Sequence, residues 1–363
     1  MEYKRVKVCE LINFINSEGF SLCKTIPITR NRAISQFNNP HASPNDIALI
    51  IAYKGSNIVG YIGILPASLT IAGINKKVYS NTGWWVDPKH GKSAAMHLFY
   101  EMLELYGNSM FFADLTPHTC LILESTGLFN MPKPSIGITG YLKSPLSAVL
   151  PKKNKIFQLV KGLLKFSDIV IDVFLFAYYR LQSKSIKLNS EISVSQINEL
   201  DEQTQRFIAT ISANTFSFRS SEEFNWIGSY PWLYDKKNGW FNEPDKYYFS
   251  SNVECFCNYY FNVFRNNELI AFIHITSRDG NFKLPYFYCY PENSNVLWPV
   301  IYSVLKKKKA ISFTTWHSEV INPKFRFFMK RKIVKQEAFS KLLLDAVSTH
   351  FSLQDGDGDM VFT

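Results

Sequence analysis

One stretch in the first third of the chain limits the fold more than any other feature. Two apolar runs, at residues 58–69 and 77–86, are separated by a Gly-Ile-Asn-Lys turn and followed by a basic turn over 87–92. The basic turn contains Pro88 and Gly91 and leads directly into a helical stripe of apolar residues over 93–106. Two strands that run into such a loop and then a helix bring free backbone N–H groups to the positive end of the helix dipole. The stretch therefore predicts a site for a phosphate group.

The remaining elements of the first 145 residues predict a mixed sheet with helices. Segments 10–17 and 30–37 have the pattern of short helices, and the runs 47–53, 58–69 and 77–86 have that of strands. After the helix at 93–106 come a strand at 110–115 and a helix at 117–126, which is stopped by Gly127. The fold class we expect is α+β or α/β.

The second half of the chain repeats this plan. The strand–turn–strand run 263–273 mirrors 52–62, and a hairpin at 278–281 leads into a strand at 282–290. A helix at 296–306, a strand at 310–315 and a helix at 322–330 are expected to follow. Between the hairpin and the helix stands Pro-Glu-Asn-Ser-Asn, where Glu292 replaces the basic glycine turn. A carboxylate there repels phosphate, so we expect no coenzyme site in this half.

The basic turn resembles the pyrophosphate-binding motif of the GNAT (N-acetyltransferase) superfamily, Arg/Gln-x-x-Gly-x-Gly/Ala after strand four. The six motif positions fall on His90, Gly91, Lys92, Ser93, Ala94 and Ala95. Only Ala95 fits strictly, because His90 replaces Arg/Gln and Ser93 replaces the middle Gly. The resemblance implies that these residues bind acetyl-CoA or another acyl-CoA as co-substrate, without a metal. It also implies that backbone N–H groups near Trp85 and Val86 polarise the thioester carbonyl.

Together the resemblance and the repeat imply two GNAT-like mixed-sheet halves joined by a helical connector, with an overall architecture similar to FemABX transferases. The expected boundaries are an acyl-CoA-binding domain at 1–147 and a connector at 148–190. The rest, 191–363, is expected to be a degenerate second GNAT-like domain on the acceptor side.

The family's usual catalytic acid is missing from the matching position. GNAT enzymes often use a Tyr on the helix after strand five, and this place falls on Leu123, which has no proton to give. His118 can accept and return a proton near neutral pH, and Asp114 four residues earlier could orient it. We therefore expect His118 and Asp114 to be catalytic. The alternative for Asp114 is a helix cap.

Charge and cysteine usage restrict the partners and the compartment. A formal net charge of +10 favours anionic partners, although no pattern for specific nucleic-acid binding is found. Six cysteines lack the spacing of zinc ligands, and the first residues are polar, without the apolar core of a signal peptide. We expect a cytoplasmic protein with reduced thiols.

Residues 152–182 differ in composition from both halves. Five lysines precede an apolar, aromatic run that is interrupted by Asp168 and Asp172. The run is too short and too charged to span a membrane. We expect a helical connector between domains. The alternative is peripheral contact of this segment with an anionic membrane surface.

Two further features concern the acceptor. Aromatic residues are concentrated between Trp226 and Tyr248, and aromatic faces suit sugar rings and extended peptides. The acidic run 354–359 predicts a glycine-rich turn before a last strand, with an anchor for the acceptor amine as the alternative.

The predicted function is acyl-CoA-dependent N-acyl transfer, with acetyl transfer to a small-molecule or carbohydrate acceptor such as an amino sugar in surface-polysaccharide assembly. Two alternatives remain open. One is a FemABX-like aminoacyl transferase acting on a cell-wall precursor, and the other is a non-catalytic GNAT-like binding module.

Overall fold

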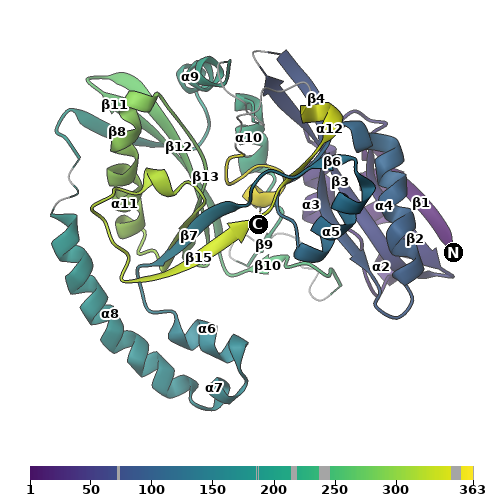
Figure 1. Ribbon diagram of the computed structural model, residues 1–363, viewed down its shortest axis with the longest axis horizontal. Helices are drawn as coiled ribbons and strands as arrows, with labels where there is room; N and C mark the ends of the chain where they lie inside the picture. The colour runs from purple at the N-terminus through teal and green to yellow at the C-terminus, as the bar shows by residue number, and fades with distance from the viewer. Residues whose placement is uncertain are drawn as a thin grey trace. The chain divides into compact units, whose positions relative to one another are not determined.

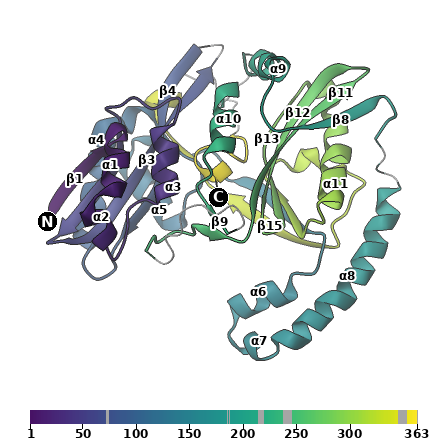
Figure 2. The same cartoon turned by 180° about the vertical axis from the view of Figure 1, so that it is seen from behind.

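The computed structural model describes residues 1–71, 74–184, 186, 188–213, 219–236, 246–344 and 353–362. The chain divides into two compact units. Unit 1 contains Met1–Ser135, Glu199–Phe256 and Lys335–Thr363, and unit 2 contains Ile136–Asn198 and Cys257–Val334. Each unit is built on a seven-stranded mixed sheet with helices (Figures 1 and 2). The predicted class, α+β with two mixed-sheet halves, is confirmed.

The sheet of unit 1 begins with four antiparallel neighbours and continues with a parallel pair. In spatial order its strands are β1 (Glu2–Lys7), β2 (Ile47–Lys54), β3 (Asn57–Ile71), β4 (Ile74–Val86), β5 (Met110–Phe112), β16 (Ala338–Ser340) and β6 (Phe129–Asn130). Strand β5 is parallel to β4, and β16 is antiparallel to both of its neighbours. The parallel pair is possible because the long helix α4 (Lys92–Tyr106) crosses between its two strands.

Helices cover both faces of this sheet. Alternate residues of β2 point to opposite sides: Ile50 packs with α4 and α5 (Pro117–Thr126), whereas Leu49 packs with the N-terminal helices. Those helices are α1 (Leu11–Asn16), α2 (Glu18–Leu22) and α3 (Arg30–Phe37). Unit 1 also contains α9 (Glu202–Ala213), α10 (Ser221–Ser229), α12 (Lys341–Leu344), the short pair β9 (Tyr234–Asp235) and β10 (Asn252–Val253), and the 3₁₀ turns η1 (Val8–Glu10), η2 (Gly107–Ser109) and η5 (Met360–Phe362).

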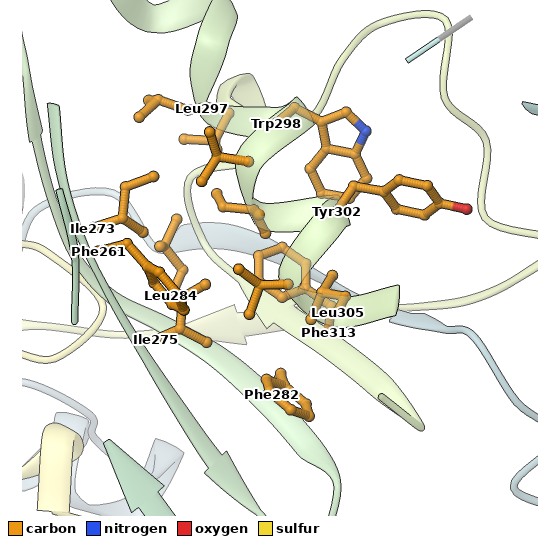
Figure 3. Close-up of a cluster of buried hydrophobic side chains, with 14 of the residues drawn as sticks. Phe261, Ile273, Ile275, Phe282, Leu284, Leu297, Trp298, Tyr302, Leu305 and Phe313 are labelled. Atoms are coloured by element: carbon orange, nitrogen blue, oxygen red, sulfur yellow. The ribbon is translucent and has the colours of Figure 1, made fainter. Parts of the chain in front are cut away.

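The sheet of unit 2 has the same layout. Its spatial order is β8 (Ile192–Ile197), β11 (Phe256–Arg265), β12 (Glu268–Arg278), β13 (Asn281–Cys289), β14 (Ser312–Thr315), β7 (Ser135–Tyr141) and β15 (Met329–Lys335). Strands β13 and β14 form the parallel pair. One face packs on α11 (Leu297–Lys307), whose Leu297, Trp298 and Leu305 share a buried core with Ile273 and Leu284 of the sheet (Figure 3).

The remaining elements of unit 2 are two 3₁₀ turns and a helical arm. The turns are η3 (Pro291–Val296), which carries Glu292, and η4 (Ser318–Val320). The arm consists of α6 (Leu146–Lys153), α7 (Ile156–Leu159) and α8 (Lys161–Ser183). The predicted connector is therefore helical. Within the described residues, no helix combines the length and apolar character needed to cross a membrane.

The two sheets exchange one strand each. Position for position they match, and the sixth strand of each sheet comes from the other half of the sequence: β16 in unit 1 and β7 in unit 2. Pro132 and Pro134 follow β6, and since proline has no N–H to donate, residues 132–134 are unsuited to a further ladder in the first sheet. The compact units are thus interleaved along the chain, unlike the continuous segments 1–147, 148–190 and 191–363 expected from the sequence.

Local element predictions were accurate where caps are strong. The observed bounds of α3 and α5 equal those predicted. Three local predictions were wrong. The short strand β1 was missed because its polar sequence lies at a sheet edge. The helix expected at 322–330 does not form: this segment contains Pro323 and leads into strand β15. The acidic run leads into η5, not into a strand.

Candidate active site

Strands β4 and β5 separate soon after they meet. Their parallel register includes only Tyr79 with Met110 and Ser80 with Phe111, whereas β4 continues to Val86 alongside β3. Among the described residues, no strand pairs with this edge of β4 beyond Ser80. Backbone groups along 81–86 are therefore left without a ladder partner on that side.

A bulge lies at the point of separation. The β3–β4 register shifts between Ile62 and Ile64, and Gly83 adopts a φ of +140° that other residues rarely take. A Cβ atom on Gly83 would lie 3.0 Å from the Phe249 ring. The position thus requires glycine for both conformation and space.

The bulge is held from below by Arg32 of α3. Its Nη1 donates to the Thr82 carbonyl at 3.3 Å, and its guanidinium lies 4.4 Å from the Trp232 ring centroid and 5.0 Å from that of Tyr247. Arg32 is 4 % exposed, and no described residue pairs with its Nε. A buried cation is therefore placed beside the end of the parallel pair.

The basic turn after β4 is organised by Asp87. Its carboxylate accepts hydrogen bonds from the backbone N–H groups of Lys89 (2.8 Å) and His90 (2.7 Å). The bond from His90 and that from Lys89 lower the pKa of Asp87 below its usual range. The His90 ring is exposed, with Nδ1 3.3 Å from the same carboxylate oxygen. These two amides are therefore occupied within the turn itself.

Gly91 joins the turn to α4. Its N–H donates to the Asp87 carbonyl at 2.7 Å, and its own carbonyl accepts from Ala94 (2.9 Å) and Ala95 (3.2 Å). A Cβ atom here would lie 2.3 Å from the Val59 carbonyl oxygen, so only glycine fits. Of the six motif positions, Lys92 and Ser93 remain with first-turn amides that an α-helix does not use.

The predicted thioester-side residues lie on the unpaired stretch of β4. Trp84 stacks on Phe99 of α4, with ring centroids 5.3 Å apart, and Trp85 packs on Tyr61 on the opposite face at 5.5 Å. Val86 is half-buried beside α4. Packing on both faces holds this stretch of backbone in a fixed position between the bulge and the turn.

The predicted catalytic pair lies near the end of β5. Asp114 is exposed, and the cap of α5 is Thr116, whose hydroxyl accepts from the Thr119 N–H at 3.2 Å. The alternative reading of Asp114 as the cap is thus wrong. His118 is exposed in the first turn of α5, and Leu123 is fully buried in the core. The catalytic roles of His118 and Asp114 stay predictions.

A second group of carboxylates lies at the same point of the sheet. Residues 355–359, here called the acid turn, contain Asp355, Asp357 and Asp359. A Cβ atom on Gly358 would lie 2.9 Å from Cβ of Ala113 and 3.2 Å from Oγ of Ser80. The acid turn therefore packs directly on the residues where β4 and β5 part.

Burial perturbs the acids of this turn. It raises the pKa of Asp357 to about 6, against the opposing effect of Arg219. The pKa of Asp359 is also raised by burial, with Arg32 acting in the opposite direction. One Asp357 oxygen accepts from the Gln354 N–H at 2.8 Å, and the other is buried without a hydrogen-bond partner among the described residues.

Arg219 ties the acid turn to α10. It donates to the Gly358 carbonyl and forms an ion pair with Glu223 at 2.8 Å, and His41 Nε2 lies 3.0 Å from the other Glu223 oxygen. Burial raises the pKa of Glu223, but Arg219 and His41 outweigh it and keep this pKa below its ordinary value. A buried network therefore fixes the turn in place.

Sequence reasoning identified the acid turn only as an alternative anchor and missed Arg32, Arg219 and Glu223. Glu223 carries a signal, because Ser220 and Glu223 have the Ser-x-x-Glu spacing of a capping box at the start of α10. Arg219 precedes that helix and carries none. Arg32 carries none, because it resembles any helix-surface arginine.

Of the aromatic residues expected to contact an acceptor, Trp226, Trp232 and Tyr247 are core residues, whereas Tyr230 and Tyr234 are half-buried and Tyr248 is exposed. Trp226 and Trp232 are buried in unit 1, and their Nε1 groups donate to the backbone oxygen (2.8 Å) and the hydroxyl (2.9 Å) of Ser35. Tyr247 is buried too. Trp240 and Phe241 lie outside the described residues. Among the residues described, no group of three or more His, Cys, Asp or Glu side chains is arranged to hold a metal.

Comparisons with known proteins establish the fold. No protein-family model matches the sequence, and no curated protein matches it significantly. A GCN5-related N-acetyltransferase from Kribbella flavida is similar in structure, with a TM-score of 0.50, 11 % identity, and coverage of 95 % of this chain and 73 % of that one. For N-myristoyltransferase from Saccharomyces cerevisiae with bound myristoyl-CoA, the TM-score is 0.49 and the identity 9 %, with coverage of 93 % of this chain and 82 % of that one. At 11 % identity the similarity to the Kribbella flavida structure shows the fold alone, and it is the predicted GNAT fold.

Proposed function

We propose that the protein is an acyl-CoA-dependent N-acyltransferase whose active site lies in unit 1. The observation that carries the proposal is the short parallel register of β4 and β5, which leaves the edge of β4 open up to the turn that begins α4. An open strand edge offers N–H groups for a carbonyl, and a helix N-terminus a few residues later offers them for phosphate.

The residues present are compatible with the coenzyme. The Lys92 and Ser93 amides would hold phosphate oxygens, with Gly91 allowing close approach of the backbone. The edge of β4 at Trp85 and Val86 would polarise the thioester carbonyl, and acyl-CoA would supply the activated acyl group. Because the amides of Lys89 and His90 are taken by Asp87, this phosphate site is smaller than the sequence motif suggests.

The acid turn supplies the acceptor side of the proposal. An ammonium group held by Asp357 and Asp359 would satisfy the unpartnered Asp357 oxygen and lose its proton to a carboxylate whose pKa is about 6. The neutral amine nitrogen then attacks the thioester carbonyl carbon and forms the amide bond as the carbon–sulfur bond breaks, and the leaving thiolate takes up the proton that this nitrogen loses. We propose an amine acceptor. Among the described aromatic residues that suggested a sugar, three are buried and Tyr248 is exposed, so the amino sugar stays a prediction from sequence.

The test is calorimetry with acetyl-CoA and longer acyl-CoA molecules, followed by release of free thiol in the presence of a panel of amines. We expect one coenzyme bound per chain, since Glu292 stands in the corresponding turn of unit 2. Two bound molecules per chain, or none, would contradict the proposal.

The residue that accepts the proton of the ammonium group is identified by comparing two variants once an acceptor is known. Asp357→Asn should lower the transfer rate by about 10²–10⁴-fold and remove the acidic limb of the pH profile, while coenzyme affinity is kept. His118→Gln tests the sequence prediction in the same assay. A loss only in His118→Gln would transfer the role to His118 and Asp114.

A further inference from the structure

The outward face of α8 is apolar along its whole length. The inward face packs on unit 2 through Leu175 and Tyr179, whose hydroxyl donates to the Tyr141 carbonyl at 2.7 Å. The opposite face, here called the outward stripe, consists of residues three or four apart: Leu163, Phe166, Ile169, Val170, Val173, Phe174, Ala177 and Leu181. Phe166 is 64 % exposed and Phe174 72 %. Such a contiguous exposed apolar surface marks a site of interaction.

The two acids of α8 do not interrupt this stripe. Asp168 accepts from the Ser144 hydroxyl (2.5 Å) and from the N–H groups of Leu146 and Ser147 (both 3.0 Å), and Asp172 accepts from the Ser144 N–H (2.6 Å). Both carboxylates thus fix the start of α6 on the inward side. The outward stripe itself therefore contains no negatively charged side chain of α8.

Cations flank the stripe at both ends. Lys153, Lys155, Lys161 and Lys165 are exposed before and along the first turns of α8. Beside its last turns lies a cavity of about 520 Å³. Its lining includes Phe176, Tyr302, one acid, Asp172, whose carboxylate accepts from the Ser144 N–H, and four cations: Lys143, Arg180, Lys306 and Lys309. Phe176 and Arg180 belong to α8 itself, so the cavity opens next to the stripe. An apolar floor with a cationic rim suits the phosphate and first methylenes of a lipid.

We propose that α8 docks on an anionic phospholipid bilayer, with the outward stripe in the interface and the cationic cavity holding lipid phosphate. Charge complementarity selects this occupant. In a second copy of the chain the flanking lysines would face one another, and like charges oppose that association. The proposal is independent of the acyl-transfer function.

The test is co-sedimentation of the full chain with vesicles of phosphatidylcholine alone or mixed with phosphatidylglycerol. We expect binding to the mixed vesicles only, with a fraction retained at high salt because the stripe is inserted. Phe166→Glu combined with Phe174→Glu should lower affinity at least about tenfold. The matched control is Leu22→Glu, an equally exposed leucine of unit 1, which should bind like wild type.

The cavity is tested separately. Lys306→Gln with Lys309→Gln should reduce the preference for phosphatidylglycerol several-fold, whereas Lys330→Gln with Lys332→Gln, exposed lysines on β15, should not. Circular dichroism confirms that each variant is folded. The proposal is overturned if wild type binds neither vesicle, if the stripe variant binds as wild type does, or if light scattering shows a dimer that the stripe variant dissociates.

Discussion

At the scale of a residue, the burial of Asp357 affects both the pKa of its carboxyl group and the stability of the fold. Its carboxyl is buried at the separation of β4 and β5, and burial raises its pKa to about 6. An acid whose pKa is higher in the folded state stabilises the fold when protonated, below its unfolded pKa of about 4. That contribution is lost as pH rises through about 6. The buried carboxylate of Asp357 therefore costs stability at neutral pH.

We predict that Asp357→Asn is more stable than wild type at neutral pH by about 1–3 kcal/mol, the scale of a two-unit pKa shift discounted for relaxation. The amide oxygen can still accept from Gln354, so the turn is kept. Urea unfolding over a pH series measures this, and the difference should disappear below about pH 4. A difference that does not depend on pH would contradict the assignment of a raised pKa.

Glu223 provides the contrast, since its pKa is lowered by Arg219 and His41 despite burial. Its stabilisation is present above its unfolded pKa and is lost as pH falls through the lower folded value. Glu223→Gln should destabilise unit 1 by about 3–5 kcal/mol at neutral pH, because it removes the carboxylate that forms an ion pair with the buried Arg219. The same urea series should show that this loss of stability shrinks in acid. The sign is opposite to that of Asp357→Asn, which gains stability at neutral pH. Equal stability of this variant and wild type at neutral pH would count against the network.

At the scale of an element, the start of α4 is the part of the fold that tests phosphate binding. Gly91→Glu looks from the sequence like a test of phosphate binding, but its Cβ would collide with the Val59 carbonyl at 2.3 Å. Loss of binding would then report a damaged turn. Ser93 is the better position because it is exposed in the first turn of α4.

We predict that Ser93→Glu weakens acyl-CoA binding at least about tenfold, because it places a negative charge where phosphate must approach. The helix itself should be kept, since an acidic residue in the first turn favours the dipole. Calorimetry measures the affinity, and Ser125→Glu near the end of α5 is the control. Unchanged affinity in a folded Ser93→Glu protein would remove the phosphate site from this turn.

At the scale of the whole molecule, each unit depends on a strand from the other half of the sequence. Phe339 of β16 is fully buried in unit 1, with its ring 6.3 Å from that of Phe111. In β7 of unit 2, a Cβ atom on Gly140 would lie 2.3 Å from the Phe327 ring. A substitution in one half of the chain should therefore damage the unit built mainly from the other half.

We predict that Phe339→Ala lowers the stability of unit 1 by about 3–5 kcal/mol and that Gly140→Ala destabilises unit 2. Hydrogen exchange followed by mass spectrometry should show lost protection in β2 and β3 for the first variant and in β12 and β13 for the second. Protection lost near the substituted residue's own half of the sequence, and not in the unit named, would contradict the strand exchange.

The sequence by itself determined the fold class and those elements whose boundary signals are local. Helix α5 illustrates why: Thr116 caps it, Pro117 occupies its first turn and Gly127 ends it with a φ of +65°, so every boundary signal lies within a few residues. The apolar pattern that predicts β3 and β4, and the residues that predict the basic turn after them, are likewise local signals. The GNAT fold followed from the order of these pieces.

Only the tertiary structure decided which strands complete each sheet and what surrounds the end of β4. Pairing of β16 with β5 joins residues more than two hundred positions apart, and no local pattern encodes such a partner. At least two hundred positions of sequence also separate the acid turn from Ser80, and Arg32 from Trp232. Capping and periodicity act between neighbours along the chain, whereas strand exchange, burial and the pKa of Asp357 arise from groups that meet only when the chain is folded.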